Sequence, residues 1–237
     1  MDRYTIPPRP TYNRLITSLP PEDVNRLLPH LDLVAFKRGA VLYEPHGAPT
    51  NLYFPTTVIV SLIYTMSNGA TAAMGIVGND GVVGVALFLG GQTSPNLAVV
   101  QVAGSALRLP VMVLHTEFQR GAALQQLLLC YTQALLTQIS QTAVCNRLHP
   151  IEQRLCRWLL LTCDRARTDA VYLTHEFLGY MLGVRRESIT TAARHLQTVG
   201  LIRYHRGRVV LLDRPGLEMS GCECYRVVKD EYSRLLG

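Results

Sequence analysis

Residues 174–197 read THEFLGYMLGVRRESITTAARHLQ and predict two short helices joined by a tight turn. Thr174 is a residue type that caps a helix by accepting a backbone N–H, and apolar residues at helical spacing follow it. Gly183 can adopt the left-handed conformation that ends a helix, so a second helix begins directly after it.

The second helix is expected to be amphipathic, with a polar first half. Arg186 and Glu187 lie at its start, while Ile189, Ala192, Ala193 and Leu196 share the opposite face. Arginine can donate two hydrogen bonds to guanine, and glutamate can accept one from the amino group of cytosine. A helix with exposed polar residues at its N-terminal end suits the major groove of DNA.

A basic hairpin is predicted next. Two β-prone runs, 199–204 and 209–212, flank Arg206-Gly207-Arg208, whose arginines would contact phosphates. Helix, turn, helix and basic hairpin in this order indicate nucleic-acid binding. Only Tyr204 could stack on an unpaired base here, so duplex DNA is favoured over RNA. The candidate DNA-contacting residues are Thr174, Arg185, Arg186, Glu187, Ser188, Thr190, Thr191, Arg194, Arg206 and Arg208.

Charge is distributed unevenly along the chain, whose formal net charge is +6. Residues 185–214 hold seven arginines against two acidic residues, whereas residues 41–145 hold two basic residues against three acidic ones. A concentrated positive field favours a polyanionic partner, so the partner is expected to bind the C-terminal part.

Residues 33–109 consist of short apolar runs separated by glycine and turn residues, a pattern typical of an antiparallel barrel or jelly roll. The runs are 33–36, 41–43, 52–54, 57–64, 71–76, 82–88, 97–102 and 106–109. Asn68-Gly69 predicts a hairpin. Before the runs, residues 12–31 are expected to be helical, with Pro20-Pro21-Glu22 opening a helix.

A long helix is predicted over 122–149, which contains neither glycine nor proline. A stripe of residues at alternating steps of three and four, Leu124, Leu128, Tyr131, Leu135 and Thr142, is the candidate dimerisation seam. The alternative is a helix that packs on its own barrel with the same residues.

The fold class is therefore expected to be α+β: a barrel or jelly roll with an N-terminal helix (1–110), a dimerisation helix (111–148) and a winged helix-turn-helix (149–237). The last boundary follows His149-Pro150, because a residue before proline disfavours the α conformation.

The six cysteines are expected to be free thiols, because no secretory signal or membrane span is recognisable and the protein is expected to be cytoplasmic. Cys222 and Cys224 could hold a soft metal, but no second pair with ligand spacing is expected to accompany them. The prediction is that no metal binds.

The chain resembles the Crp/Fnr family of bacterial regulators, named after the cyclic-AMP receptor protein and the fumarate and nitrate reduction regulator. The resemblance rests on Leu178-Gly-x-x-Leu-Gly-Val184, on Arg186-Glu187-Ser188, and on residues 196–202 with the basic hairpin. It implies that a homodimer binds a two-fold symmetric duplex and contacts RNA polymerase, and that Arg186 and Glu187 read bases. Thr191 stands where the family often has arginine, so the operator is expected to differ.

The family's glycine pattern for cyclic nucleotides is also present, as residues 78–84, but the arginine that binds the phosphate is missing. Residues 81–107 carry no charged side chain, so a buried phosphate would lack a counter-charge. We therefore expect no gating by cyclic AMP and no cofactor. The alternative is a sensor for an unidentified neutral or apolar effector, or for haem held by His30, His46 or His115. The family's iron–sulfur sensors use N-terminal cysteines, and none precedes Cys130 here.

An enzyme is not expected. His175-Glu176 begins a zinc-protease pattern, but Gly179 stands where its second histidine would be. No nucleophile elbow or phosphate loop is recognisable.

Overall fold

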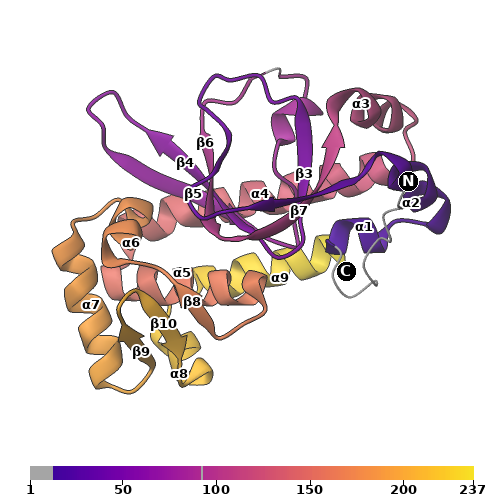
Figure 1. Ribbon diagram of the computed structural model, residues 1–237. Helices are drawn as coiled ribbons and strands as arrows, with labels where there is room; N and C mark the ends of the chain where they lie inside the picture. The colour runs from indigo at the N-terminus through magenta and orange to yellow at the C-terminus, as the bar shows by residue number, and fades with distance from the viewer. Residues whose placement is uncertain (1–12, 92) are drawn as a thin grey trace.

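The computed structural model describes residues 13–91 and 93–237, and its N-terminal part is a sandwich of two antiparallel sheets (Figure 1). One sheet has the order β1-β7-β3 and the other β2-β6-β4-β5. The strands are β1 (Asp32–Phe36), β2 (Val41–Tyr43), β3 (Asn51–Pro55), β4 (Ile59–Thr65), β5 (Thr71–Val77), β6 (Leu97–Val102) and β7 (Gly104–Pro110). The sandwich confirms the jelly roll, and the sheets do not close into a barrel.

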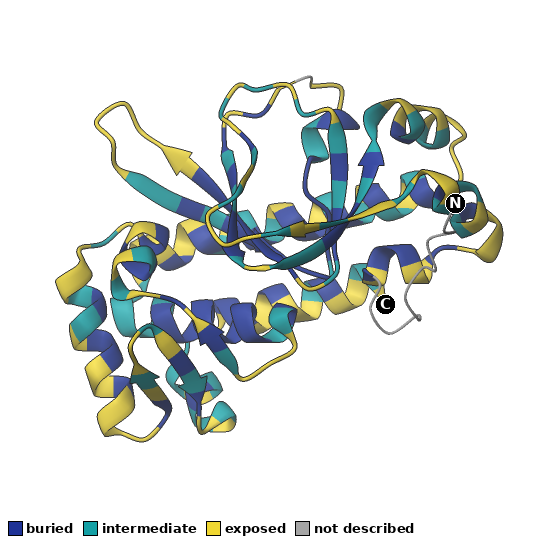
Figure 2. Ribbon diagram, in the orientation of Figure 1, coloured by how far each residue is buried: buried dark blue, intermediate teal, exposed yellow. Residues whose placement is uncertain are grey.

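Strand β4 is buried on both faces along its first five residues. Buried and exposed residues do not alternate along this part of β4, because both faces of its sheet are covered. The other sheet covers one face, and helix α5 (Ile151–Ala166) lies against the other (Figure 2). Two buried polar hydrogen bonds join this sheet to α5: the Ser61 hydroxyl donates to Gln101 Oε1 (2.7 Å), and Gln101 Nε2 donates to Thr162 Oγ1 (3.0 Å).

The apolar run 82–88 is not a strand, contrary to the prediction. It forms one bridge, between Tyr53 and Val83, and then the 3-10 helix η3 (Val85–Leu87). Gly84, with φ of 112°, interrupts the extended backbone, and this local signal outweighs β propensity. The Asn68-Gly69 hairpin between β4 and β5 is confirmed, with Gly69 at φ of 82°.

The N-terminal helical region is broken into α1 (Arg14–Ser18), α2 (Pro21–Leu27) and the 3-10 helix η2 (Leu28–His30). Tyr12, where the predicted helical segment began, lies outside the described residues.

The predicted segment 111–148 is two helices, α3 (Val111–Gln119) and α4 (Ala123–Leu148). Gly121, at φ of 68°, separates them. Helix α4 ends at Leu148, and the capping residue His149 is extended before Pro150, as predicted. No helix among residues 13–91 and 93–237 is long and apolar enough to cross a membrane.

The predicted dimer seam of α4 lies inside the single chain. Leu124, Leu128, Tyr131, Leu135 and Thr142 are 0–5% exposed. Helix α4 uses this side to pack on strand β5 and on the C-terminal helix α9 (Cys224–Leu236). Tyr131 and Tyr232 meet edge to face, and Gln138 donates to the carbonyl of Ile76 (3.1 Å). These five side chains therefore cannot face a partner, and the alternative, intramolecular packing, accounts for their pattern.

Two glycines of the 78–84 segment are required by close packing rather than by turns. A Cβ on Gly81 would lie 2.6 Å from Cε2 of Tyr131, and a Cβ on Gly78 would lie 2.5 Å from Cβ of Arg165. Neither glycine has a positive φ. Arg165 is 4% exposed, and its Nε is 3.1 Å from Oδ1 of Asp80 in the same segment. Helices α4 and α5 therefore both pack closely against the sandwich at this segment.

Replacing Gly81 by alanine is expected to destabilise the protein, because the new methyl group overlaps the buried Tyr131 ring. The loss should be about 1–3 kcal/mol in urea unfolding, the usual cost of overpacking. Gly91→Ala is the control, since its Cβ would meet only ordinary contacts at 3.6 Å or more. Equal unfolding midpoints for the two variants would contradict the packing role.

Candidate nucleic-acid interface

Helix α6 (His175–Leu182) begins and ends as its sequence predicts. The Thr174 hydroxyl accepts a hydrogen bond from the backbone N–H of Phe177 (3.2 Å), and Gly183 closes the helix at φ of 63°. The Gly179 position allows no side chain, because a Cβ there would lie 2.9 Å from the carbonyl oxygen of Val184. The turn between the two helices is thus set by two glycines.

Helix α7 (Arg186–Thr198) presents its polar face to solvent. Ile189, Ala192, Ala193 and Leu196 are 0–3% exposed and pack on α5 and α6. Arg185, which precedes the helix, and Arg186 and Glu187, which begin it, are exposed. In Figure 2 the outer side of α7 is largely exposed.

The predicted basic hairpin is formed by β9 (Ile202–His205) and β10 (Arg208–Leu211), with β8 (Ala170–Tyr172) pairing on the far side of β10. Its tip is the two-residue loop Arg206-Gly207, at φ of 47° and 80°. Positive φ at both positions is what a tight hairpin turn requires, and it projects Arg206 and Arg208 into solvent.

Most of the predicted DNA-contacting residues lie on the accessible surface, and their cations have no acidic partner. The exposed ones are Thr174, Arg185, Arg186, Glu187, Thr191, Arg194, Arg206 and Arg208, and Ser188 is half-buried. In the part of the chain that the structure describes, none of these five arginines forms an ion pair. The surface is thus positive and unneutralised.

Two residues of the basic segment, the predicted DNA-contacting Thr190 and the counted cation Arg214, make contacts within the chain. The Thr190 hydroxyl is half-buried, lying 3.0 Å from the carbonyl of Arg186 and 2.9 Å from Nδ1 of His175. Arg214 pairs with Asp164, Asp169 and Glu218. The charge count from the sequence therefore overstates the free charge of the surface by one.

The sequence did not identify His175 as a support of the interface. Its ring stacks on Tyr204 with centroids 4.2 Å apart, and the Tyr204 hydroxyl donates to the carbonyl of Leu173 (2.8 Å). This pair joins the start of α6 to the wing strand and, through Thr190, to α7. The contact with His175 occupies one face of the Tyr204 ring.

The turn of the helix-turn-helix touches the sandwich. The carbonyl oxygen of Thr71 would lie 3.3 Å from a Cβ on Gly183, and the Thr71 hydroxyl donates to the carbonyl of Tyr180 (3.4 Å). Strand β5, which carries Thr71, thus reaches α6 directly (Figure 1).

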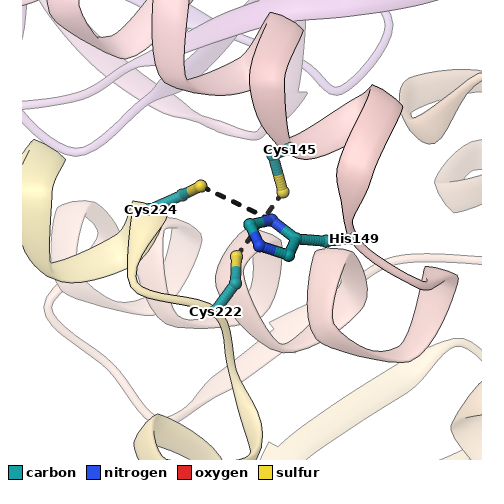
Figure 3. Close-up of side chains that lie close together, drawn as sticks. All are labelled: Cys145, His149, Cys222 and Cys224. Atoms are coloured by element: carbon teal, nitrogen blue, oxygen red, sulfur yellow. Dashed lines mark hydrogen bonds between the residues drawn. The ribbon is translucent and has the colours of Figure 1, made fainter.

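A second cluster of functional side chains lies away from this surface. Cys145, His149, Cys222 and Cys224 approach one another closely (Figure 3), so the expectation that no second ligand pair accompanies Cys222 and Cys224 was wrong. Cys145 and His149, one helical turn apart, are that pair. All six cysteines are free thiols in the structure.

Acidification is expected to lower the stability of the folded domain through protonation of His175. Burial lowers the pKa of His175, and the nearby Arg186 cation lowers the pKa further. The unfolded state therefore binds more protons between the lowered pKa and the ordinary value of about 6.5, so stability rises with pH across this window and is lost as pH falls through it.

Urea unfolding at pH 7.5 and at pH 5.5 tests this. His175→Gln should reduce the difference in unfolding free energy between the two pH values. His205→Gln, at an exposed position on β9, is the control. If the His175→Gln variant kept the wild-type difference in unfolding free energy between the two pH values, His175 would not be the group responsible for it.

Comparison with known proteins agrees with this architecture. Residues 153–220 match the model of the Crp-like helix-turn-helix domain. No curated protein sequence matches the chain. The structure is similar to FixK2 from Bradyrhizobium japonicum (TM-score 0.68, 16% identity, covering 81% of this chain and 98% of that one). It is also similar to the c-di-GMP-responsive regulator CLP from Xanthomonas campestris (TM-score 0.66, 17% identity, 81% and 99% covered).

A third solved structure, a CRP/FNR-family transcriptional regulator from Thermus thermophilus, has a TM-score of 0.61 at 22% identity, with 80% of this chain and 97% of that one covered. In this chain the order of elements is jelly roll, long helix, winged helix-turn-helix. The chain therefore has the Crp/Fnr fold with a Crp-like helix-turn-helix domain at residues 153–220, and the resemblance to the Crp/Fnr family is confirmed.

Proposed function

We propose that the protein is a transcription regulator that binds duplex DNA sequence-specifically as a homodimer. The observation that carries the proposal is the solvent-facing start of α7, where Arg186 and Glu187 stand unpaired beside the basic wing. His175, which begins the metalloprotease-like pattern, is stacked on Tyr204.

The exposed residues divide into two roles. Arg186 and Glu187, on the first turn of α7, are placed to reach base edges in the major groove. Arg206 and Arg208, at the wing tip, are placed to contact phosphates, which fixes the position of the protein but carries no sequence information. Thr174, on the same side as the wing tip, is near Gly207, with a Cβ there 3.5 Å from its methyl group.

Selection of bound duplexes from a random pool tests this proposal. The full chain should enrich a two-fold symmetric site, and added cyclic AMP should not change it. Arg186→Ala and Glu187→Ala should each lose about 1–3 kcal/mol of discrimination at one base position. Arg208→Ala should weaken all sequences alike and reduce the slope of log affinity against log salt by about one. Sequence preference that survives Arg186→Ala would contradict the placement of α7 in the groove.

The homodimer is assigned to the exposed side of α4. Helix α4 has an outward stripe at steps of four and three: Leu129, Gln133, Leu136, Ser140, Ala143 and Arg147, all exposed. Leu136 is 58% exposed and Leu129 44%, and Val144 beside them is 44% exposed. This spacing is that of a coiled-coil seam, and Ser140 and Ala143 are small enough to let two helices approach closely.

Leu136→Glu should convert the dimer into a monomer, because it places two like charges at the middle of the seam. Light scattering at micromolar concentration measures the mass. Leu33→Glu is the control, since Leu33 is similarly exposed (52%) on strand β1. A dimeric Leu136→Glu protein would locate the interface elsewhere.

Cyclic AMP is not proposed as the effector, because the glycine segment that would receive it is filled from within the chain. The Asn13 amide donates to the carbonyls of Gly81 (2.7 Å) and Pro55 (2.9 Å), and Tyr131 covers Gly81. An unidentified neutral or apolar effector remains the alternative. Haem is less favoured, because Nε2 of His115 already bonds the carbonyl of Leu87 (2.9 Å). The family resemblance alone supports a further part of the proposal, that the DNA-bound protein contacts RNA polymerase.

A further inference from the structure

Four side chains from two distant parts of the chain form the second cluster. Cys145 lies in the last turn of α4 and His149 caps that helix, while Cys222 lies in the loop after helix α8 (Arg214–Ser220) and Cys224 begins α9. Figure 3 shows the four side chains pointing toward one another between these segments. We propose that these residues form a tetrahedral site for a thiophilic divalent cation, Zn²⁺.

The distances suit a single ion. The sulfurs of Cys145 and Cys222 are 3.5 Å apart, and the sulfur of Cys224 is 3.6 Å from Nδ1 of His149. Tetrahedral zinc with bonds of about 2.3 Å to sulfur and about 2.0 Å to nitrogen holds its ligand atoms roughly 3.5–3.8 Å apart. All four ligand atoms lie within 4.8 Å of one another. An iron–sulfur cluster, whose ligands are spread around several irons, needs more room than this.

The outer contacts of the histidine also fit a ligand. Nε2 of His149 lies 3.5 Å from Oε2 of Glu223, which leaves Nδ1 turned toward the three sulfurs. A carboxylate on the second ring nitrogen is the usual partner of a zinc-bound histidine, because it orients the ring and fixes the tautomer.

Charge is the independent argument. Arg157, on α5, is 2% exposed and lies within electrostatic range of the three sulfurs. Its Nη2 donates to Thr142 Oγ1 (2.7 Å), its Nε lacks a hydrogen-bond acceptor, and it forms no ion pair with any carboxylate of residues 13–91 and 93–237. A buried guanidinium stays charged and needs an anion. Three thiolates on one Zn²⁺ leave a single negative charge, which balances Arg157.

The site would join the end of α4 to the start of α9, next to the His149-Pro150 junction from which α5 departs. Metal bonds there would fix the angle between the long helix and the DNA-binding domain. This role is structural: all four ligand positions come from the protein, so none is left open for a substrate.

The test uses the untagged full chain, purified under reducing conditions and loaded with Zn²⁺. Elemental analysis after dialysis should find about one zinc per chain. Substitution with Co²⁺ should give visible d–d absorption of tetrahedral cobalt together with sulfur-to-cobalt charge transfer, and excess Zn²⁺ should bleach both. Cys145→Ser, Cys222→Ser and Cys224→Ser should each lower zinc retention at least ten-fold. Cys163→Ser, at an equally buried cysteine outside the cluster, should keep it.

The cobalt spectrum is measured on the wild-type protein, so its result does not depend on whether a cysteine variant folds. Absence of tetrahedral cobalt absorption in the folded, reduced wild type would overturn it. So would a brown chromophore with several irons per chain. A disulfide between Cys145 and Cys222, found by peptide mapping of the metal-free protein, would also overturn it.

Discussion

The packing of helix α4 between the jelly roll and helix α9 is the constraint on which the rest of the structure depends. Its inward stripe brings Tyr131 so close to the sheet that a Cβ at position 81 would overlap the Tyr131 ring. The neighbouring Gly78 admits Arg165 of α5, which pairs with Asp80. One short segment thus seats both long helices, and the orientation of the winged helix-turn-helix follows from α5.

The local features of the winged helix-turn-helix domain could be predicted because each depends on a few adjacent residues. Thr174 caps α6, Gly183 ends it, and the Arg206-Gly207 tip sets the hairpin turn. In contrast, the face of α4 that packs internally could not be distinguished from a dimer seam. Both require an apolar stripe at steps of three and four, and only the position of α9, about ninety residues further along, decides between them.

Non-adjacent contacts also explain the other differences from prediction. Arg214 counts as a free cation in the sequence, but Asp164 and Asp169 lie beside it once α5 is folded. His175 stands in a metalloprotease-like pattern, yet it stacks on Tyr204 of the wing strand. The Cys145-His149 and Cys222-Cys224 pairs are each unremarkable alone, and their proximity becomes visible only when α9 returns along α4.

The contact between Thr71 and Tyr180 gives the molecule a closed mechanical loop. The helix-turn-helix is attached to the sandwich through the chain itself, from α4 into α5, and again through the β4–β5 hairpin. A body held at two points cannot swing about one of them alone: it must either release the other or carry it along. Any reorientation of helix α7 relative to α4 therefore has to break the contact between Thr71 and Tyr180 or move the β4–β5 hairpin with it.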